Sequence, residues 1–439
     1  MSGEIIGLLM LAGMLFGIFV GFPISFTLIF LGLVFGYWGF GKLVFYLLTL
    51  QFYGTMMEQT LTAIPLFVFM GLLMERANLM ERLFDAAQGL LVNLRGALFI
   101  AVMFVATIFS AATGIVGASV TLLGIMAGKP MIRAGYDTRL SSGLITAGGT
   151  LGILIPPSIM LIVMGPVLEV PVTTLFVAAI LPGLMLAGLF TGYALLRSRL
   201  DPRIAPLPPA RQADADLGAL WIELGKGFVP PVALVAFSLG SIILGLATPT
   251  EGAACGALGA LLLTVLYRRL TWRGLTDALI KTLEISVLIL FLVAASNFFG
   301  AVFARLGTPA YLSDLLLSLD LHPYALLALV MALIFLLGWP LEWVPIVLIV
   351  VPFVLPLMRE LDFDLTWFGI LVAVNLQTAW LSPPVALSAY FLRGVVPEWP
   401  LRDIYAGMLQ FMGLQVLGLV LIILFPSIAL WLPRLIYGD

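Results

Sequence analysis

The sequence contains very few of the residues from which soluble enzymes build reactive sites. Among 439 residues there is one cysteine, Cys255, and one histidine, His322. A single cysteine excludes an intrachain disulfide, and one histidine cannot build a His-based metal site. No convergent catalytic set is evident, so a membrane-embedded enzyme is disfavoured. The Gly-x4-Gly-Lys-Ser/Thr pattern of ATP-binding loops is also absent, which gives no support to ATP-driven chemistry.

Charge is scarce as well. Charged residues make up 10% of the chain and hydrophobic residues 62%, and the mean hydropathy is +1.17. Soluble domains carry about 25% charged residues, so this composition predicts an all-α protein embedded in lipid. The net charge of −2 offers no basic face for nucleic acid. Because Met1–Glu4 lacks the positive region of a cleavable signal peptide, we expect the first apolar stretch to be retained as a membrane helix.

Ten apolar runs have about the length needed to cross a ~30 Å hydrocarbon core. They lie at 5–22, 24–40, 61–75, 140–165, 172–196, 229–247, 251–267, 283–304, 365–392 and 403–431. Two further apolar segments are interrupted. Gly96–Met131 is broken near Ser110–Gly117, and Tyr324–Met358 is broken at Gly338–Glu342. Each half of these segments is too short to cross alone, which favours two re-entrant helical hairpins over full crossings.

The distribution of basic residues predicts the orientation. With the N-terminus on the periplasmic side, 17 of the 21 Lys and Arg residues fall on the cytoplasmic side. The four on the outside are Lys42, Arg305, Arg359 and Arg434. This bias follows the positive-inside rule for a multi-pass protein of the bacterial inner membrane. Counting either broken segment as two crossings gives the same balance, so charge alone leaves that alternative open.

The chain divides into two related halves. We expect a first half at 1–196, a cytoplasmic linker at 197–228 rich in proline and charge, and a second half at 229–439. Pro156-Pro157 follows Pro130 by 26 residues, and Pro383-Pro384 follows Pro356 by 27. Five crossings in each half give the halves opposite orientations. The pattern therefore predicts an inverted-topology repeat with two broken helices, which is typical of secondary transporters.

Short amphipathic stretches accompany the spans. Leu79–Leu94 is predicted to lie at the cytoplasmic interface, with Leu270–Leu283 as its counterpart in the second half. Such arm helices could brace a moving core against a fixed scaffold. Their amphipathic pattern does not by itself establish that role.

The Pro pairs indicate where ions bind. A Pro pair removes two backbone donors and interrupts a helix, which leaves carbonyl groups that lipid cannot satisfy and that suit sodium. Hydroxyl or carbonyl oxygens of the first predicted site come from Ser110, Thr113, Gly152, Ile155 and Pro157. Those of the second come from Gly338, Ala379, Ser382 and Val385. The alternative is that the Pro pairs only kink helices packed on Gly and Ala.

Polar residues inside apolar segments are the second indication, because burying them is expensive. Five of them are predicted to line a solute cavity: Thr150, Ser158, Asn297, Glu342 and Gln377. Glu342 has an alternative role as a cap at a helix N-terminus, and capping is the preferred interpretation of Glu251 in Thr248-Pro249-Thr250-Glu251.

Several motifs resemble a known family. They are Ile108–Thr113, Gly152–Ser158, Gly245–Glu251 and Leu381–Pro384, and together they are similar to motifs of the large membrane subunit of tripartite ATP-independent periplasmic (TRAP) transporters. The resemblance covers nearly the whole chain. It implies an elevator-type carrier without a cofactor, driven by a sodium gradient, that imports a small organic acid. It also implies two partners, a small four-helix membrane subunit and a periplasmic binding protein that captures a carboxylate-bearing solute.

The sequence departs from the family pattern at two places. Ser382 stands where the family often has threonine, and the tip Gly338-Trp339-Pro340-Leu341-Glu342 has Glu in place of Asp. The first change keeps a hydroxyl and the second keeps a carboxylate, whereas Trp339 and Pro340 are departures that would alter the backbone geometry of the tip. A stand-alone sodium–dicarboxylate symporter remains an alternative with the same repeat. A channel is disfavoured because no selectivity-filter sequence is evident.

Overall fold

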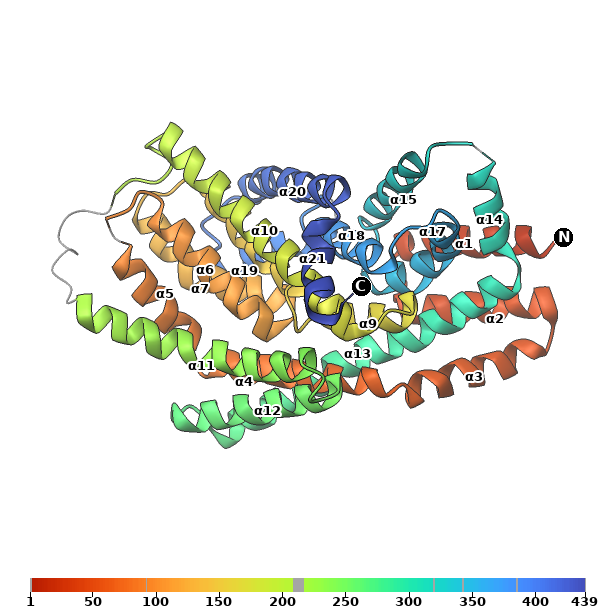
Figure 1. Ribbon diagram of the computed structural model, residues 1–439, viewed down its shortest axis with the longest axis horizontal. Helices are drawn as coiled ribbons and strands as arrows, with labels where there is room; N and C mark the ends of the chain where they lie inside the picture. The colour runs from red at the N-terminus through yellow and green to blue at the C-terminus, as the bar shows by residue number, and fades with distance from the viewer. Residues whose placement is uncertain are drawn as a thin grey trace.

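Long apolar helices dominate the computed structural model (Figure 1), which describes residues 2–91, 93–207, 217–318, 320–341, 343–383 and 386–438. The side chains of 110–113, 217 and 219 are outside that description. In lipid a helix satisfies every backbone group internally, and all regular elements of the described chain are helical. The predicted all-α class is confirmed.

Most of the first set of helices, here called the outer group, runs along the lower side of Figure 1, with α1 and α14 higher up at the right. Helix α13 packs against α2, α3 and α4, α12 packs against α4, and α11 packs against α5. Its members are α1 (Gly3–Val20), α2 (Ile24–Phe40), α3 (Leu43–Met57), η1 (Gln59–Thr62), α4 (Ala63–Arg76), α5 (Leu79–Leu90), α11 (Leu217–Ile243), α12 (Pro249–Leu266), α13 (Trp272–Arg305) and α14 (Thr308–Leu317).

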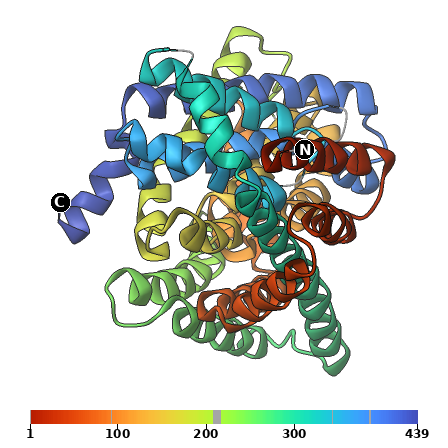
Figure 2. The ribbon, with the colours of Figure 1, turned by 90° about the vertical axis from the view of Figure 1, so that its right-hand side faces the viewer.

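The second set, the inner group, holds the interrupted segments. From the first half of the chain come α6 (Ala97–Thr113), α7 (Val116–Arg133), α8 (Thr138–Thr150), η2 (Leu151–Ile153), α9 (Ile159–Leu168) and α10 (Val172–Leu200). From the second half come α15 (Pro323–Leu337), α16 (Trp343–Pro345), η4 (Ile346–Val350), α17 (Val351–Glu360), α18 (Leu365–Gln377), η5 (Thr378–Trp380), α19 (Leu387–Val395), α20 (Leu401–Leu424) and α21 (Ser427–Tyr437). Figure 2 shows α21 projecting at one side of the molecule.

The inner group repeats the same order of elements. In each half an interrupted segment is followed by a 13-residue helix, α8 or α18, and then by a three-residue 3-10 turn. The side chain of Asp137 accepts from the Leu140 N–H, and that of Asp364 accepts from the Trp367 N–H, so both helices start with the same cap. Positions 137 and 364 differ by 227, as do 151 and 378, where the two turns begin.

The interruptions fall where the sequence places them. Helix α6 ends at Thr113 and α7 begins at Val116, and the intervening Gly114 has φ of +61°. That left-handed conformation suits glycine. Helix α15 ends at Leu337 and α16 begins at Trp343. Because α6 packs against α7, the first segment folds back on itself as a hairpin.

Other details differ from the sequence prediction. The stretch 270–283 is not a separate interfacial helix, because α13 continues without a break through Trp272–Arg305. The offset of 227 residues that relates the two halves instead pairs α5 with the short helix α14. Helix α3, at 43–57, was not among the predicted spans. Helix α10 runs on to Leu200 and α11 begins at Leu217, both inside the stretch predicted as linker.

Within the described residues, seven single helices are long and apolar enough to cross a membrane, or eight if the bent pair α3 and α4 counts as one span. Several predicted crossings are built from shorter pieces, such as α8 with α9 and α18 with α19. Because an apolar run has the same composition whether or not its helix is interrupted, the spans at 140–165 and 365–392 were predicted as single crossings. The protein is a multi-pass membrane protein.

The two halves of the inner group exchange partners. Helix α20 of the second half packs on α8 of the first, and α10 of the first half packs on α18 of the second. At the contact of α8 with α20, Gly143 and Gly407 face each other; a Cβ built on Gly143 would lie 2.6 Å from the Gly407 carbonyl carbon. The inner group is therefore one interlocked body, and its core lies where the broken helices meet.

Candidate ion and solute site

The first broken helix carries the earlier Pro pair. After η2 the chain passes through Pro156 and Pro157 before α9 starts, and every residue from 151 to 160 is buried. The Ser158 hydroxyl donates to the Ile153 carbonyl at 2.5 Å and accepts from the Leu161 N–H at 3.5 Å. Ser158 therefore fixes the interruption and caps α9.

Three predicted ligands of the first sodium site lie on this interruption, namely Gly152 in η2 and Ile155 and Pro157 in the following loop. The first hairpin approaches the same loop, because a Cβ built on Gly114 would lie 3.7 Å from the Pro157 carbonyl oxygen. The structure thus brings the break of the hairpin beside the break of the helix. The side chains of Ser110 and Thr113, just before Gly114, are outside the described part of the structure.

The second broken helix also has a serine hydroxyl bonded to a backbone carbonyl, although Ser382 precedes its Pro pair and Ser158 follows the first one. Helix α18 ends at Gln377, and the Ser382 hydroxyl donates to the Thr378 carbonyl at 2.7 Å. Ala379 lies in η5, and a Cβ built on Gly338 would come within 3.3 Å of the Ala379 Cβ. The structure therefore brings together Gly338 and Ala379, which were predicted to share a site. Glu342, Pro384 and Val385 are outside the described residues.

A buried amide side chain joins the two broken helices. Gln415 of α20 is fully buried, and its Nε2 donates to Thr150 Oγ1 at 3.0 Å and to Gln377 Oε1 at 3.4 Å. Thr150 is the last residue of α8 and Gln377 the last of α18. Two of the predicted cavity residues therefore meet through a third residue. We call Thr150, Gln377 and Gln415 the amide bridge.

The amide bridge retains hydrogen-bonding capacity. Gln377 Nε2 and Gln415 Oε1 have no partner among the described residues, nor has Oδ1 of the neighbouring Asn375, whose Nδ2 donates to the Met331 carbonyl at 2.7 Å. Unpaired buried amide atoms cost about 1–3 kcal/mol each. Neutral donors and acceptors of this kind bind small polar groups without introducing a charge that excludes cations.

Gln415 was not among the residues predicted from the sequence. A glutamine within the apolar run of α20 is expensive to bury and is itself a signal. Its partners are 265 and 38 residues away along the chain. No local pattern connects positions so far apart, so only the fold shows that this residue belongs to the site.

Asn297 does not join the amide bridge. Its Nδ2 donates to Thr55 Oγ1 of α3 at 3.0 Å, within the outer group. It lines a cavity of about 350 Å³ between the groups, with Gln51 and Glu58 on the outer side and Val163 and Leu348 on the inner side. Asn297 thus faces the boundary between the groups, away from the ends of the broken helices.

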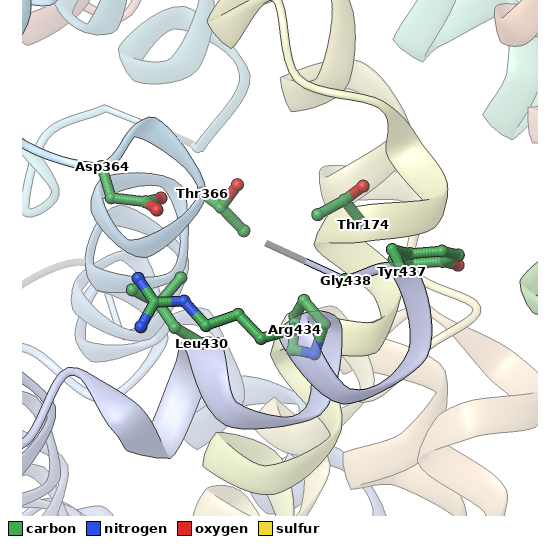
Figure 3. Close-up of a pocket in the computed structure, with 8 residues that line it drawn as sticks. Thr174, Asp364, Thr366, Leu430, Arg434, Tyr437 and Gly438 are labelled. Carbon is green, nitrogen blue, oxygen red and sulfur yellow. The ribbon is translucent and has the colours of Figure 1, made fainter.

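A second cavity, of about 550 Å³, lies between α10, α18 and α21 (Figure 3). It is lined by Thr174 of α10, Asp364 and Thr366 at the start of α18, and Arg434 and Tyr437 of α21. Figure 3 shows the Arg434 side chain extending toward the side of the cavity where Asp364 and Thr366 lie. None of the predicted site residues lines this cavity.

The sequence matches one known family over most of its length. Residues 11–428 match the family described as tripartite ATP-independent periplasmic transporter, DctM component. The chain belongs to this family. Membership in the TRAP family makes it a transporter subunit and not an enzyme, and it implies partnership with a small permease subunit and a periplasmic binding protein.

Similar TRAP permeases span almost the same length. The chain is 30% identical over 435 residues to the sialic acid TRAP transporter large permease protein SiaM of Vibrio cholerae, which covers 98% of this chain and 99% of that protein. It is 28% identical to the C4-dicarboxylate permease DctM of Pseudomonas aeruginosa, over 88% of this chain and 89% of that one. It is also 30% identical to the 2,3-diketo-L-gulonate permease YiaN of Escherichia coli, over 88% and 90%.

One solved structure has a similar fold. It is the YdaH transporter of Alcanivorax borkumensis, whose topology is described as unusual, with a TM-score of 0.62 over 89% of this chain and 88% of that one. At 16% sequence identity, the likeness concerns the fold alone.

Proposed function

We propose that this TRAP permease imports a small carboxylate-bearing organic acid that a periplasmic binding protein delivers, and that a sodium gradient drives the uptake. The observation that carries the proposal is the pair of broken helices, each interrupted at a Pro pair and each approached by the break of another segment. Interrupted helices place free carbonyl groups in the interior of the molecule, where a hard cation such as sodium satisfies them.

The proposed sodium sites follow the two breaks. The first takes oxygens from Ser110, Thr113, Gly152, Ile155 and Pro157, and the second from Gly338, Ala379, Ser382 and Val385. The solute binds between them, with Thr150, Ser158, Gln377 and Glu342 on its path. Asn297 is proposed to act at the boundary of the outer and inner groups, since its hydrogen bond to Thr55 places it there.

The proposed class of solute follows from a chemical group that the solutes of three similar permeases share. Sialic acid, C4-dicarboxylates and 2,3-diketo-L-gulonate, for which three similar permeases are named, are all carboxylic acids. Half-helix N-termini such as that of α9, at Ile159, favour a carboxylate. These observations support an organic acid as the cargo.

Elevator-type movement is proposed from the way polar contacts are distributed. The ion pair Arg76–Asp277 and the bond of Asn297 to Thr55 lie within the outer group. The ion pair Arg139–Asp403 and the amide bridge lie within the inner group. These contacts tie each group to itself, whereas the hydrogen bond from Tyr437 to Ile243 crosses between the groups at one edge. We propose that the inner group carries ions and solute past the outer group while the small four-helix subunit steadies the outer group. In this proposal the N-terminus is periplasmic.

Uptake into proteoliposomes tests the proposal. The chain is reconstituted with and without its small subunit and binding protein, and uptake of radiolabelled organic acids is followed under an inward sodium gradient. Uptake that requires all three components and sodium supports the tripartite carrier. Uptake by the chain alone replaces it with the stand-alone dicarboxylate symporter, which the same repeat would serve. Uptake that proceeds equally in potassium removes sodium coupling.

A further inference from the structure

Gln415 contacts corresponding positions of the two broken helices. Thr150 and Gln377 differ by 227 in position, the same offset that relates the helix caps and the 3-10 turns of the two halves. Each is the last residue before its interruption, and the Gln415 Nε2 reaches both. The ends of the two broken helices, each next to a proposed sodium site, are therefore linked through one side chain.

Helix α20 holds Gln415 firmly in this place. Eight residues before it, Gly407 packs against the backbone of α8, where a Cβ on Gly407 would lie 2.0 Å from the Arg139 carbonyl oxygen. Seven residues after it, the Ile422 carbonyl accepts from the Trp367 Nε1 of α18 at 2.9 Å. Because α20 is fixed to α8 on one side and to α18 on the other, movement of either broken helix end changes the bonds of Gln415.

The bonds of the amide bridge are incomplete in this state. A link that served only the stability of one conformation would pair its buried amide atoms, since each unpaired atom is costly. Here Gln377 Nε2, Gln415 Oε1 and Asn375 Oδ1 lack partners among the described residues. The three amides therefore keep hydrogen-bonding capacity for a second set of partners, and coupling between two sites requires an element with two such arrangements.

We propose that Gln415 is a positioning residue that couples the two sodium sites, so that sodium at one break favours the bound geometry of the other. This inference rests on the proposed sodium sites. Coupling free energies between sites commonly change affinity by about 5-fold or more. Loss of Gln415 removes the connection while leaving the oxygens of each break in place.

Sodium binding without solute provides the test. The full chain, purified with its small subunit, is titrated with sodium chloride against choline chloride, and the thermal unfolding temperature is recorded. The wild type is expected to give a sigmoidal sodium dependence. In Gln415→Leu the Hill coefficient is expected to fall to about 1, and the half-saturating sodium concentration to rise by about 5-fold or more.

Matched variants separate coupling from simple loss of stability. Gln410→Leu removes a hydrogen bond from the same helix, to Tyr193 of α10 at 2.8 Å, and should keep the sigmoidal curve. Thr150→Val should flatten the curve as Gln415→Leu does, the double variant should add nothing further, and Thr150→Ser, which keeps the hydroxyl, should restore it. Thr150→Val also serves if Gln415→Leu fails to fold.

Two outcomes count against the inference. If Gln415→Leu and Thr150→Val lower the unfolding temperature but leave the shape and midpoint of the sodium curve unchanged, Gln415 is structural only. If the wild type itself binds sodium without cooperativity, the sites are independent and the coupling is absent. A wild type that shows no sodium-specific stabilisation at all contradicts the proposed function, which distinguishes that failure from the other two.

Discussion

Gly143 of α8 and Gly407 of α20 bring two helices from opposite halves of the chain into backbone contact. A Cβ on Gly407 would lie 2.0 Å from the Arg139 carbonyl oxygen and 2.9 Å from the Gly143 nitrogen. These neighbouring atoms belong to the backbone of α8, so they cannot move aside for an added Cβ as the end of a flexible side chain could. This contact sets how closely α20 approaches the first broken helix, and hence where Gln415 lies.

Gly407→Ala is therefore expected to destabilise the protein by about 1–3 kcal/mol, as overpacking of a tight contact does. Thermal unfolding in detergent measures the loss. Gly413→Ala, on the same helix with nothing within 4 Å of the added Cβ, is the matched control and should be neutral or slightly stabilising. Equal behaviour of the two variants would show that α20 does not approach α8 so closely.

Cross-linking α21 to the outer group is expected to stop transport. The Tyr437 hydroxyl donates to the Ile243 carbonyl at 3.2 Å and so joins α21, which packs on α10 and α18 of the inner group, to α11 of the outer group. In a background with Cys255→Ser, the pair Ile243→Cys and Tyr437→Cys is joined by a short bifunctional thiol reagent. If the inner group moves past the outer group, uptake falls by at least about tenfold in the joined protein.

The control for this cross-link joins two residues within the inner group. Arg139 and Asp403 form an ion pair at 2.9 Å between α8 and α20. A cross-link between Arg139→Cys and Asp403→Cys should leave uptake nearly unchanged, because these helices move together. Uptake at the wild-type rate after positions 243 and 437 are joined would contradict movement of α21 relative to α11 during transport.

Ser382→Ala is expected to weaken sodium activation more than folding. Its hydroxyl donates to the Thr378 carbonyl at the second break, and loss of one such bond costs about 0.5–1.5 kcal/mol, or about twofold to thirteenfold in the half-activating sodium concentration. Ser110→Ala is expected to act in the same way at the first break. Ser388→Ala, a buried serine of α19, is the control. Sodium activation of wild-type strength in both Ser382→Ala and Ser110→Ala would leave only carbonyls as ligands.

Asp85 on α5 gives a prediction about pH. Partial desolvation beside neighbouring groups, with a further contribution from the charge of Glu81, raises the pKa of the Asp85 carboxyl above its ordinary value of 3.8, although the side chain stays largely in contact with solvent. A raised pKa means that the folded state binds the proton more tightly. The stabilisation it provides is therefore full below about pH 4 and is lost as pH rises through the raised pKa.

Asp85→Asn should accordingly be more stable than the wild type at pH 7, by less than about 1 kcal/mol because the side chain is exposed. The difference should vanish near pH 4, which thermal unfolding at the two pH values measures. A variant that is less stable than the wild type at pH 7 would show that ionised Asp85 makes a favourable contact.

The sequence predicted the parts of this protein that leave a local signal. Composition indicated membrane helices, and the Pro pairs at 156–157 and 383–384 indicated the two interruptions, because proline removes donors whatever the fold around it. The break near Gly114 and the turn after Leu337 were also predicted, from small and polar residues inside apolar runs.

Features that depend on distant contacts were not predicted. Gln415 is one glutamine in a long apolar helix until the fold places Thr150 and Gln377 beside it. Asn297 and Gln377 were both predicted to line the solute cavity, yet Asn297 hydrogen-bonds to Thr55 in a different part of the molecule. The continuity of α13 was missed because the polar residues near its start suggested an interfacial helix, whereas Thr271 caps a helix that continues to Arg305.

The exchange of partners between the two halves also fixes the order in which the protein can be assembled. Helix α8 is synthesised more than 250 residues before α20, the helix that covers the face bearing Gly143 and Thr150. During that interval Gly143 and Thr150, which contact Gly407 and Gln415 of α20 in the finished protein, lack their final neighbours. The inner group is complete only after almost the whole chain has been inserted, so a nascent chain released before α20 carries an unprotected polar face that the quality-control proteases of the membrane can recognise.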